Sequence, residues 1–191
     1  MRVIGKLGLT EQQKRERKNY VTCSFLPALA AGDEDRIYQE WQIKTGAVEE
    51  EDLSWILPVQ LGSLTEAMNA DFYEHETGHT IAREGKAMVC EDHPFLRATL
   101  DGFIEEIPAV WQAKHVNQFA KPDEVVAKYT PQVTGEMLCA GVETAILSVF
   151  YGTLKYEYYK IELDPFYSAS LIAKAGEFWQ AVCDRVPPPR S

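Results

Sequence analysis

The hydrophobic period changes in the middle of the chain, and this change limits the folds that are open to it. Residues 59–77 carry apolar side chains at helical spacing, which predicts a long amphipathic helix that stops at Gly78. Residues 96–101 and 109–116 alternate their side chains with a period of two, which is typical of strands. Helices followed by strands predict an α/β or α+β fold with a central mixed sheet flanked by helices.

The remaining segments fit the same arrangement. The helix over residues 59–77 carries an apolar stripe made by Leu61, Leu64, Met68, Phe72 and Tyr73. Further helices are expected over residues 22–31, 33–45, 123–150 (with a break near Pro131) and 166–185. Further strands are expected over residues 80–83, 87–90 and 156–163. The turn region over residues 102–108 suits a hairpin between the two period-two segments.

The length of the chain predicts one domain. Its 191 residues are enough for one sizeable core, with a basic segment over residues 1–18 and a flexible tail over residues 186–191. No apolar run approaches the roughly 20 residues that cross a bilayer, and the N-terminus has no secretory pattern. We therefore expect a cytoplasmic protein with no membrane partner.

Cysteine content and net charge exclude some classes of function. The four cysteines form no closely spaced pair, so we expect buried free thiols without a disulfide or an iron–sulfur cluster. The net charge of −10 argues against nucleic acid as a partner unless basic residues gather in one groove.

Three residues on adjoining strands form the candidate catalytic group. Asp101 ends one expected strand, and Gln112 and Lys114 lie on the next, where residues two apart share a face. Carboxylates and a lysine on adjoining strands are the layout of a Mg²⁺-dependent nuclease. The metal lowers the pKa of a bound water, and the lysine offsets the charge that develops on phosphorus.

Other short motifs surround this group in a fixed order. They are Gly62-x-x-x-Glu66, Leu100-Asp101-Gly102, Gln112-x-Lys114 and Tyr129-x-x-Gln132. Their order and spacing resemble the YqaJ-type viral recombinases, the family that includes lambda exonuclease, within the PD-(D/E)xK nuclease superfamily. The resemblance runs from about Arg17 to Trp179 and implies a restriction-endonuclease-like core.

The resemblance also implies a role for each matching residue. The catalytic residues would be Glu66, Asp101, Gln112, Lys114 and Gln132, with Tyr129 beside them over the active site. The metal ligands would be Asp101, Gln112, the backbone carbonyl of Ala113, and Glu66. Arg17 and Ser24 would hold the 5′-phosphate of DNA, and Val59 would be a wedge that parts the duplex end.

The resemblance implies an activity and partners as well. The expected enzyme degrades linear double-stranded DNA from 5′ to 3′ with Mg²⁺, or alternatively Mn²⁺, as the cofactor. It would form a ring-shaped homotrimer and work with a single-strand annealing recombinase in a bacterial cell, with a phage or prophage origin. Such a ring would reconcile the acidic net charge with DNA binding, because basic residues need only line its channel.

Gln112 departs from the family pattern, which has a glutamate at this position. Glutamine is isosteric with glutamate but neutral, so we expect weaker metal binding and a slower reaction. Gln112 is either a substitution introduced to trap DNA uncut or a natural residue of a weak or inactive nuclease; the otherwise intact site favours the first. Three functions therefore stay open: an exonuclease, a non-catalytic module that binds DNA ends, and an endonuclease of the same superfamily.

Overall fold

The computed structural model describes residues 16–53, 55–83 and 87–190, so most of the expected basic segment over residues 1–18 lies outside the described residues, as does Ser191. The helical elements are the 3-10 turn η1 (Cys23–Phe25) and the helices α2 (Leu26–Ala31), α3 (Glu34–Thr45), α4 (Leu57–Thr77), α5 (Pro122–Ala140) and α6 (Pro165–Cys183). The strands are β1 (Val21–Thr22), β2 (Ile81–Ala82), β3 (Ala87–Val89), β4 (Leu96–Thr99), β5 (Gly102–Ile104), β6 (Ala109–Val116), β7 (Thr144–Tyr151) and β8 (Lys155–Glu162).

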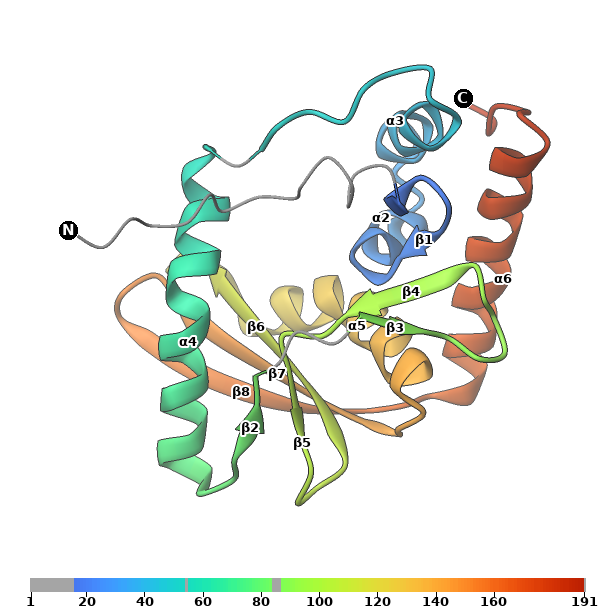
Figure 1. Ribbon diagram of the computed structural model, residues 1–191. Helices are drawn as coiled ribbons and strands as arrows, with labels where there is room; N and C mark the ends of the chain where they lie inside the picture. Colours follow the sequence, from blue (N-terminus) through green and yellow to red (C-terminus); the bar gives the residue numbers. More distant parts are fainter. Residues whose placement is uncertain (1–15, 54, 84–86, 191) are drawn as a thin grey trace.

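A five-stranded mixed sheet forms the centre of the molecule, as predicted (Figure 1). Its strand order is β2-β5-β6-β7-β8, in which β6 and β7 run parallel and the other neighbours run antiparallel. In the parallel pair Gln112 lies opposite Leu147 and Lys114 lies opposite Val149. The strand that carries the candidate site is therefore held on both sides.

A second, three-stranded sheet has the order β1-β4-β3. The expected hairpin between residues 96–101 and 109–116 is therefore wrong, because β4 belongs to this small sheet and β6 pairs with β5 instead. The close passage of the chain at Gly102 allows this change of sheet. A Cβ atom there would lie 2.4 Å from a methyl group of Ile81. Asp101 thus sits where the chain passes from one sheet to the other.

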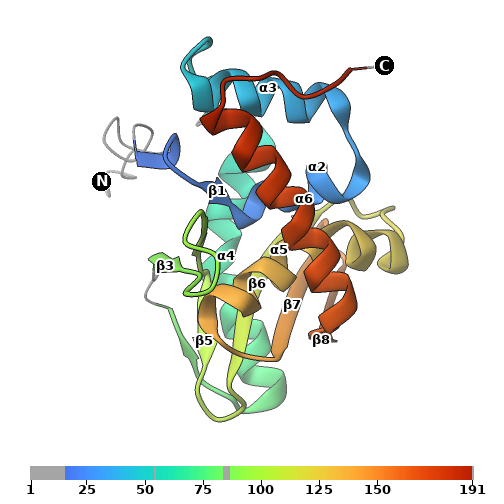
Figure 2. The ribbon, with the colours of Figure 1, turned by 90° about the vertical axis from the view of Figure 1, so that its right-hand side faces the viewer.

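Helices cover both faces of the large sheet. Trp111 packs in one cluster with Tyr73 of α4, whereas its neighbour Val110 packs in another with Val133 of α5. Because successive strand residues point to opposite faces, α4 and α5 lie on opposite sides of the sheet. Helices α2, α3 and α6 extend the core beyond α5, and α6 lies on the far side of the molecule from α4 (Figures 1 and 2).

The segment expected as one helix over residues 123–150 is a helix followed by a strand. Helix α5 continues through Pro131 and ends at Gly141, whose positive φ of 67° favours glycine. Residues 144–151 form β7, a central strand that is buried on both faces. Such a strand is apolar without alternation, so the period-two signal is absent from it.

The other expected elements match more closely. Strand β6 has the predicted bounds, and α3, β8 and α6 agree to within a residue or two at each end. The expected helix over residues 22–31 is split into η1 and α2, and no side chain caps either of them.

Four of the five residues in the apolar stripe of α4 are exposed, and only Tyr73 belongs to its buried face. Leu64 is 55% exposed and Met68 is 47% exposed, whereas Asn69, Ala70 and Tyr73 face the sheet. Small and hydrogen-bonding side chains therefore make the contact with β6 and β7, which brings this helix close to the strand that carries Gln112 and Lys114.

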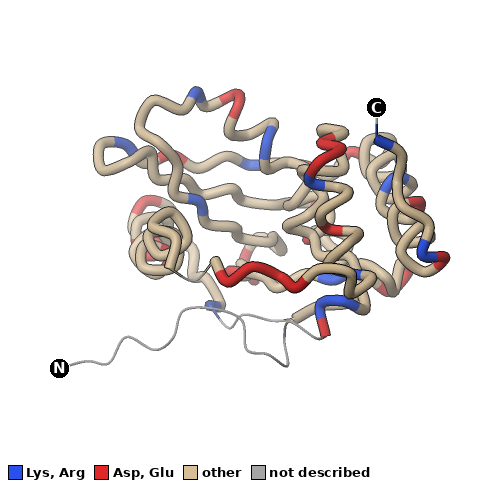
Figure 3. Tube along the Cα trace, turned by 90° about the horizontal axis from the view of Figure 1, so that it is seen from above, with Lys and Arg blue, Asp and Glu red and all other residues tan. Residues whose placement is uncertain are grey.

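Three of the four cysteines are buried free thiols, as expected, and Cys183 is exposed. No helix among the described residues is long and apolar enough to span a membrane. The acidic run over residues 49–52 forms an unbroken stretch on the loop that leads to α4, while Lys and Arg are scattered elsewhere along the trace (Figure 3).

Candidate active site

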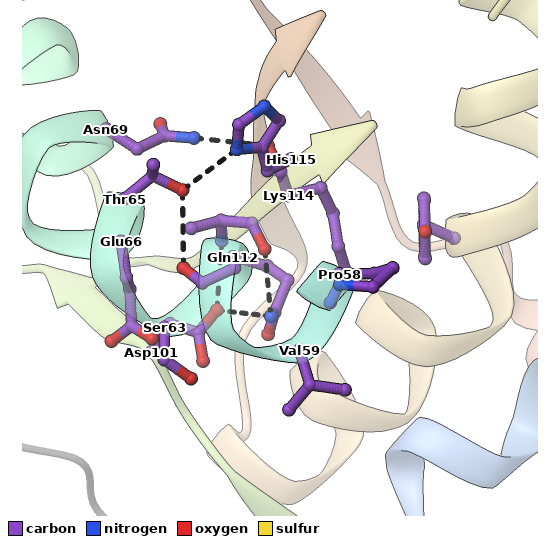
Figure 4. A pocket seen from close by; sticks show the side chains of 13 residues that line it. Pro58, Val59, Ser63, Thr65, Glu66, Asn69, Asp101, Gln112, Lys114 and His115 are labelled. Atoms are coloured by element: carbon purple, nitrogen blue, oxygen red, sulfur yellow. Dashed lines mark hydrogen bonds between the residues drawn. The ribbon is translucent and has the colours of Figure 1, made fainter. Parts of the chain in front are cut away.

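A cavity of about 370 Å³ lies between α4, β6 and the first part of α5 (Figure 4). It brings together seven of the residues singled out from the sequence: Val59, Glu66, Asp101, Gln112, Ala113, Lys114 and Tyr129. The other three, Arg17, Ser24 and Gln132, line a second cavity on the small sheet. The geometry groups these residues, while their catalytic roles stay predictions.

Asp101 is the central acid of the first cavity. Its Oδ2 accepts hydrogen bonds from the side-chain amide of Gln112 and from the backbone N–H of Ala113, the latter at 3.0 Å. Burial raises the pKa of this carboxyl above its ordinary value, while the positive charge of Lys114 and the two hydrogen bonds partly offset the rise. The carboxylate is therefore oriented by β6 before any ligand binds.

The amide of Gln112 bridges two groups that could hold a cation. Its Nε2 donates to Asp101 and lies 3.5 Å from the carbonyl oxygen of Ala113. Its Oε1 is buried and has no hydrogen-bond partner among the described residues. The N–H groups of Gln112 thus face the acceptors that a metal would face, and a carbonyl oxygen with a free lone pair lies beside them.

Glu66 reaches the same cavity from α4, which is anchored to the sheet one turn later by Asn69. The Asn69 amide donates to the backbone carbonyl of Ser148 at 3.1 Å, and its oxygen accepts from the Ser148 hydroxyl at 2.6 Å. Desolvation raises the pKa of Glu66 to about 7, the negative charge of Asp101 adds to the rise, and Lys114 opposes it. Near neutral pH this group can therefore take up or release a proton.

Lys114 completes the charged set. It projects from the same side of β6 as Gln112, and its Nζ lies 5.0 Å from the centre of the Tyr129 ring. A cation over an aromatic face is held in place without being neutralised. Lys114 is therefore positioned near both carboxylates as an available cation.

The donor set fits a hard divalent cation. Asp101 and Glu66 supply carboxylate oxygens and Ala113 supplies a backbone carbonyl oxygen, which are ligands that Mg²⁺ prefers, whereas Gln112 directs its N–H group at Asp101 and at the Ala113 carbonyl. Across the described part of the chain, no three His, Cys, Asp or Glu side chains gather as a ready metal site. This site has two carboxylates, whereas a site with Glu in place of Gln112 would have three. We therefore expect this site to bind a metal ion more weakly.

The second cavity has a volume of about 410 Å³ and lies against β1, β4 and α5. The hydroxyl of Ser24 donates to that of Thr22 at 3.1 Å, so two hydroxyl groups meet at its wall. The guanidinium of Arg17 lies 3.4 Å from the carboxylate of Glu50. Gln132, which was expected over the first cavity, lines this one instead.

Glu136 is a buried acid that the sequence did not indicate. It is 1% exposed and lines the second cavity. Its Oε1 accepts from the Gln132 amide at 2.8 Å, while Oε2 has no partner among the described residues. Burial raises its pKa to about 8. The spacing in the sequence places Glu136 one helical turn after Gln132, but it does not indicate that this face of α5 is buried.

Comparisons with known proteins agree with this architecture. The family described as YqaJ-like viral recombinase domain matches residues 14–143. An alkaline exonuclease from Laribacter hongkongensis is 18% identical with a TM-score of 0.74, covering 93% of this chain and 94% of the other. Its structure in complex with dAMP gives a TM-score of 0.75 at the same identity and coverage.

A third solved structure is more distant. A phage-related exonuclease from Haemophilus somnus 129PT is 14% identical with a TM-score of 0.62, covering 85% of this chain and 91% of the other. At these identities the structural likeness establishes the fold. No curated protein matches the chain.

Proposed function

Because the chain belongs to the YqaJ-like viral recombinase family, we propose that it is an exonuclease that degrades linear double-stranded DNA with a divalent metal ion. The convergence of Glu66, Asp101 and Lys114 in one cavity carries this proposal. Two carboxylates and a lysine around an oxygen-lined space are the groups that phosphodiester hydrolysis requires. Exonuclease activity of the neighbouring proteins, as their names give it, agrees with this assignment.

Mg²⁺ is the proposed cofactor, and Mn²⁺ is the alternative. Asp101 and the carbonyl of Ala113 would hold the ion, with Glu66 and the Gln112 oxygen completing the set. When bound, the ion would polarise the scissile phosphate and lower the pKa of a bound water.

The residues of this chain would do the remaining work. Lys114, fixed against Tyr129, would offset the negative charge that develops on the phosphate. Glu66, whose carboxylate lines the same cavity, would accept a hydrogen bond from the attacking water. Val59 at the rim of the cavity would part the end of the duplex, and Arg17 and Ser24 would line the site for the 5′-phosphate.

The finer features of the proposal follow the family. We propose cleavage from 5′ to 3′ with release of mononucleotides, a ring-shaped homotrimer, and a single-strand annealing recombinase as the partner. The protein would act in the cytoplasm of a bacterial host, in recombination of the phage type.

The second candidate is a module that binds DNA ends without cutting them. The Gln112 amide favours it, because this neutral group stands beside Asp101, where a third acid would strengthen metal binding. Such a module would have both cavities and would lack only the cleavage of the phosphodiester bond.

Digestion of linear and closed circular duplex distinguishes these functions. The protein and Gln112→Glu would each be incubated with Mg²⁺ or Mn²⁺ and 5′-phosphorylated DNA, and nucleotide release would be measured. An exonuclease digests linear DNA and spares circles, whereas an endonuclease of the same superfamily cuts circles. Tight binding of ends with no release, even in Gln112→Glu, would support the binding module and contradict the enzyme.

A further inference from the structure

We propose that Cys23 and Cys139 form a redox-sensitive pair, which a peroxide oxidises to a disulfide that links η1 to α5 and narrows the second cavity. The proposal assigns a site of reversible modification to two thiols that the proposed nuclease chemistry does not use. Only its consequence for DNA binding rests on the proposed function, which places the DNA end in that cavity.

The sulfur atoms of this pair are in contact in the folded protein. The Sγ atoms of Cys23 and Cys139 lie 3.8 Å apart, although the two residues are 116 positions apart in the sequence. Both thiols are buried. A disulfide holds its sulfur atoms about 2 Å apart, so a further approach of roughly 2 Å closes the bond. The pair is therefore close enough to be oxidised after a small shift of one element.

Helix α5 makes room for Cys23 at Gly135. A Cβ atom at Gly135 would lie 2.9 Å from the Sγ of Cys23 and 3.4 Å from its Cβ. Gly135 lies about one turn before Cys139, so the glycine lets η1 settle on the face of α5 that carries the second thiol. Two elements that already pack together in the core thus present the two sulfur atoms to each other.

The other two cysteines are placed differently. Cys90 is near enough to Cys139 to influence its pKa, but the Sγ of Cys90 contacts the backbone carbonyl of Leu138 at 3.8 Å. Cys183 is exposed at the end of α6. One buried thiol and one exposed thiol are therefore available as controls for the pair.

The second cavity gives a small oxidant access to the pair. Cys23 lines this cavity of about 410 Å³, whereas Cys139 belongs to the buried core cluster. Hydrogen peroxide is little larger than a water molecule, which occupies about 30 Å³ in the liquid, so the cavity can admit it. Cys23 is therefore the thiol that meets the oxidant, and Cys139 is the thiol that completes the disulfide.

The oxidation uses one hydrogen peroxide for two thiols. The sulfur of Cys23 attacks one peroxide oxygen, the O–O bond breaks, and Cys23 becomes a sulfenic acid as one water leaves. The sulfur of Cys139 then attacks the sulfur of Cys23, which forms the S–S bond, breaks the S–O bond and releases a second water. The two thiols lose two electrons and two protons in total, and the peroxide is reduced to water.

The contact between the thiols favours Cys139 as the attacking group in the second step. Its hydrogen bond with Cys23 lowers the pKa of Cys139, whereas burial raises the pKa of Cys23. The thiolate is the reactive form of a cysteine, so the first step is the slower one. Oxidation of this pair therefore requires an excess of peroxide.

The disulfide would change the second cavity because the two linked elements form its walls. Thr22 and Ser24, which flank Cys23, line the cavity on one side, and Glu136 of α5 lines it on another. Closing the S–S bond draws η1 toward α5 by up to about 2 Å. We therefore expect the oxidised protein to bind a DNA end more weakly, and a dithiol reductant to restore the binding.

The test is a map of the disulfides before and after treatment with excess hydrogen peroxide. Free thiols would be alkylated in denaturant, and the peptides would be analysed by mass spectrometry without reduction. The whole chain, Cys139→Ala, Cys90→Ala and Cys183→Ala would be treated alike. Cys90→Ala is the matched control because it removes a second buried thiol near Cys139, and Cys183→Ala removes the thiol that could link two molecules.

We expect a peptide pair joined through Cys23 and Cys139 in the whole chain, in Cys90→Ala and in Cys183→Ala, and we expect dithiothreitol to separate it. Binding of a 5′-phosphorylated duplex would be followed by fluorescence anisotropy in EDTA. The oxidised chain should bind about tenfold more weakly than the reduced chain, as the loss of one charge-assisted hydrogen bond implies. Peroxide should leave the binding by Cys139→Ala unchanged, which also controls for oxidation elsewhere in the chain.

Three results would overturn the proposal. Cys23 and Cys139 that stay free after peroxide, or a Cys139 that is joined to Cys90 instead, would show that the pair is not a redox site. A disulfide that forms without changing DNA binding would show that it does not narrow the cavity. A reduced protein that binds no DNA would contradict the proposed function instead, because the disulfide map decides the redox site by itself.

Discussion

Gln112→Glu should make the metal-free protein less stable and should make DNA digestion faster when metal is present. In the present chain the Gln112 amide donates to Asp101, so these two side chains are hydrogen-bonded without an ion, while Gln112 Oε1 has no partner among the described residues. A glutamate here would place a second carboxylate in hydrogen-bonding range of the first. At about 4 Å and an effective dielectric constant of about 20, the repulsion is about 4 kcal/mol. The pair relieves part of this by sharing a proton, so we expect a net loss of about 2 kcal/mol.

That loss can be measured as a melting temperature. For a chain of this size, about 2 kcal/mol corresponds to a decrease of roughly 4–8 °C in Tm without metal. Because a divalent cation binds the folded state, Mg²⁺ should return most of that decrease to Gln112→Glu and change the parent chain less. The third carboxylate should also raise the rate of digestion of linear duplex by about 10²–10³.

Gln118→Glu is the matched control, because Gln118 is exposed on the loop after β6 and the variant adds the same charge outside the cavity. Scanning calorimetry in EDTA and in Mg²⁺, with nucleotide release from linear DNA, checks both effects. A Gln112→Glu variant with the Tm, metal response and digestion rate of Gln118→Glu would refute the assignment of this cavity as a metal site.

Three further predictions concern the fold around the two cavities. Glu136→Gln should be more stable than the parent above pH 8, by a few kcal/mol. The folded protein holds the Glu136 proton up to a pKa of about 8, so the parent loses stability as pH rises from about 4.5 to 8, which urea titrations at several pH values would measure. Gly135→Ala should destabilise the protein by about 1–3 kcal/mol, because a Cβ there would lie 2.3 Å from a methyl group of Leu26; thermal unfolding checks this. Asn69→Ala should cost about 1–3 kcal/mol and weaken Mg²⁺ binding by Gln112→Glu, because Ser148 loses the partner that holds α4; calorimetry measures both.

Each of these has an outcome that contradicts it. Parallel pH profiles for the parent and Glu136→Gln would mean that this acid is ionised throughout. An unchanged Tm in Gly135→Ala would mean that α5 and α2 separate easily. Full metal affinity in Asn69→Ala would mean that Glu66 does not depend on this anchor.

The sequence predicted the first cavity better than the packing around it. Gln112 and Lys114 could be placed on one side of a strand because residues two apart must share a face, and β6 has the predicted bounds. Strand β7 was missed because a strand covered on both faces has no alternation, so its apolar run continued the helix before it. The stripe of α4 misled because only Tyr73 among its five residues meets the sheet, where the neighbouring Asn69 and Ala70 make the rest of the contact.

Charged residues inside the protein were the least predictable. Glu136 reads as a solvated residue in a helix, and only the fold buries it against a cavity. Such roles depend on tertiary contacts, which local periodicity does not encode.

The joint between the two sheets fixes the spacing between the two cavities. Thr99 lines one cavity, Asp101 lines the other, and a single residue, the buried Leu100, separates them. Two residues of extended backbone span about 7 Å, a length set by covalent geometry. If a strand of DNA occupies both cavities, this length of backbone sets the distance between the groups that it contacts in each. Inserting one residue beside Leu100 would change this spacing even if every charged group were kept.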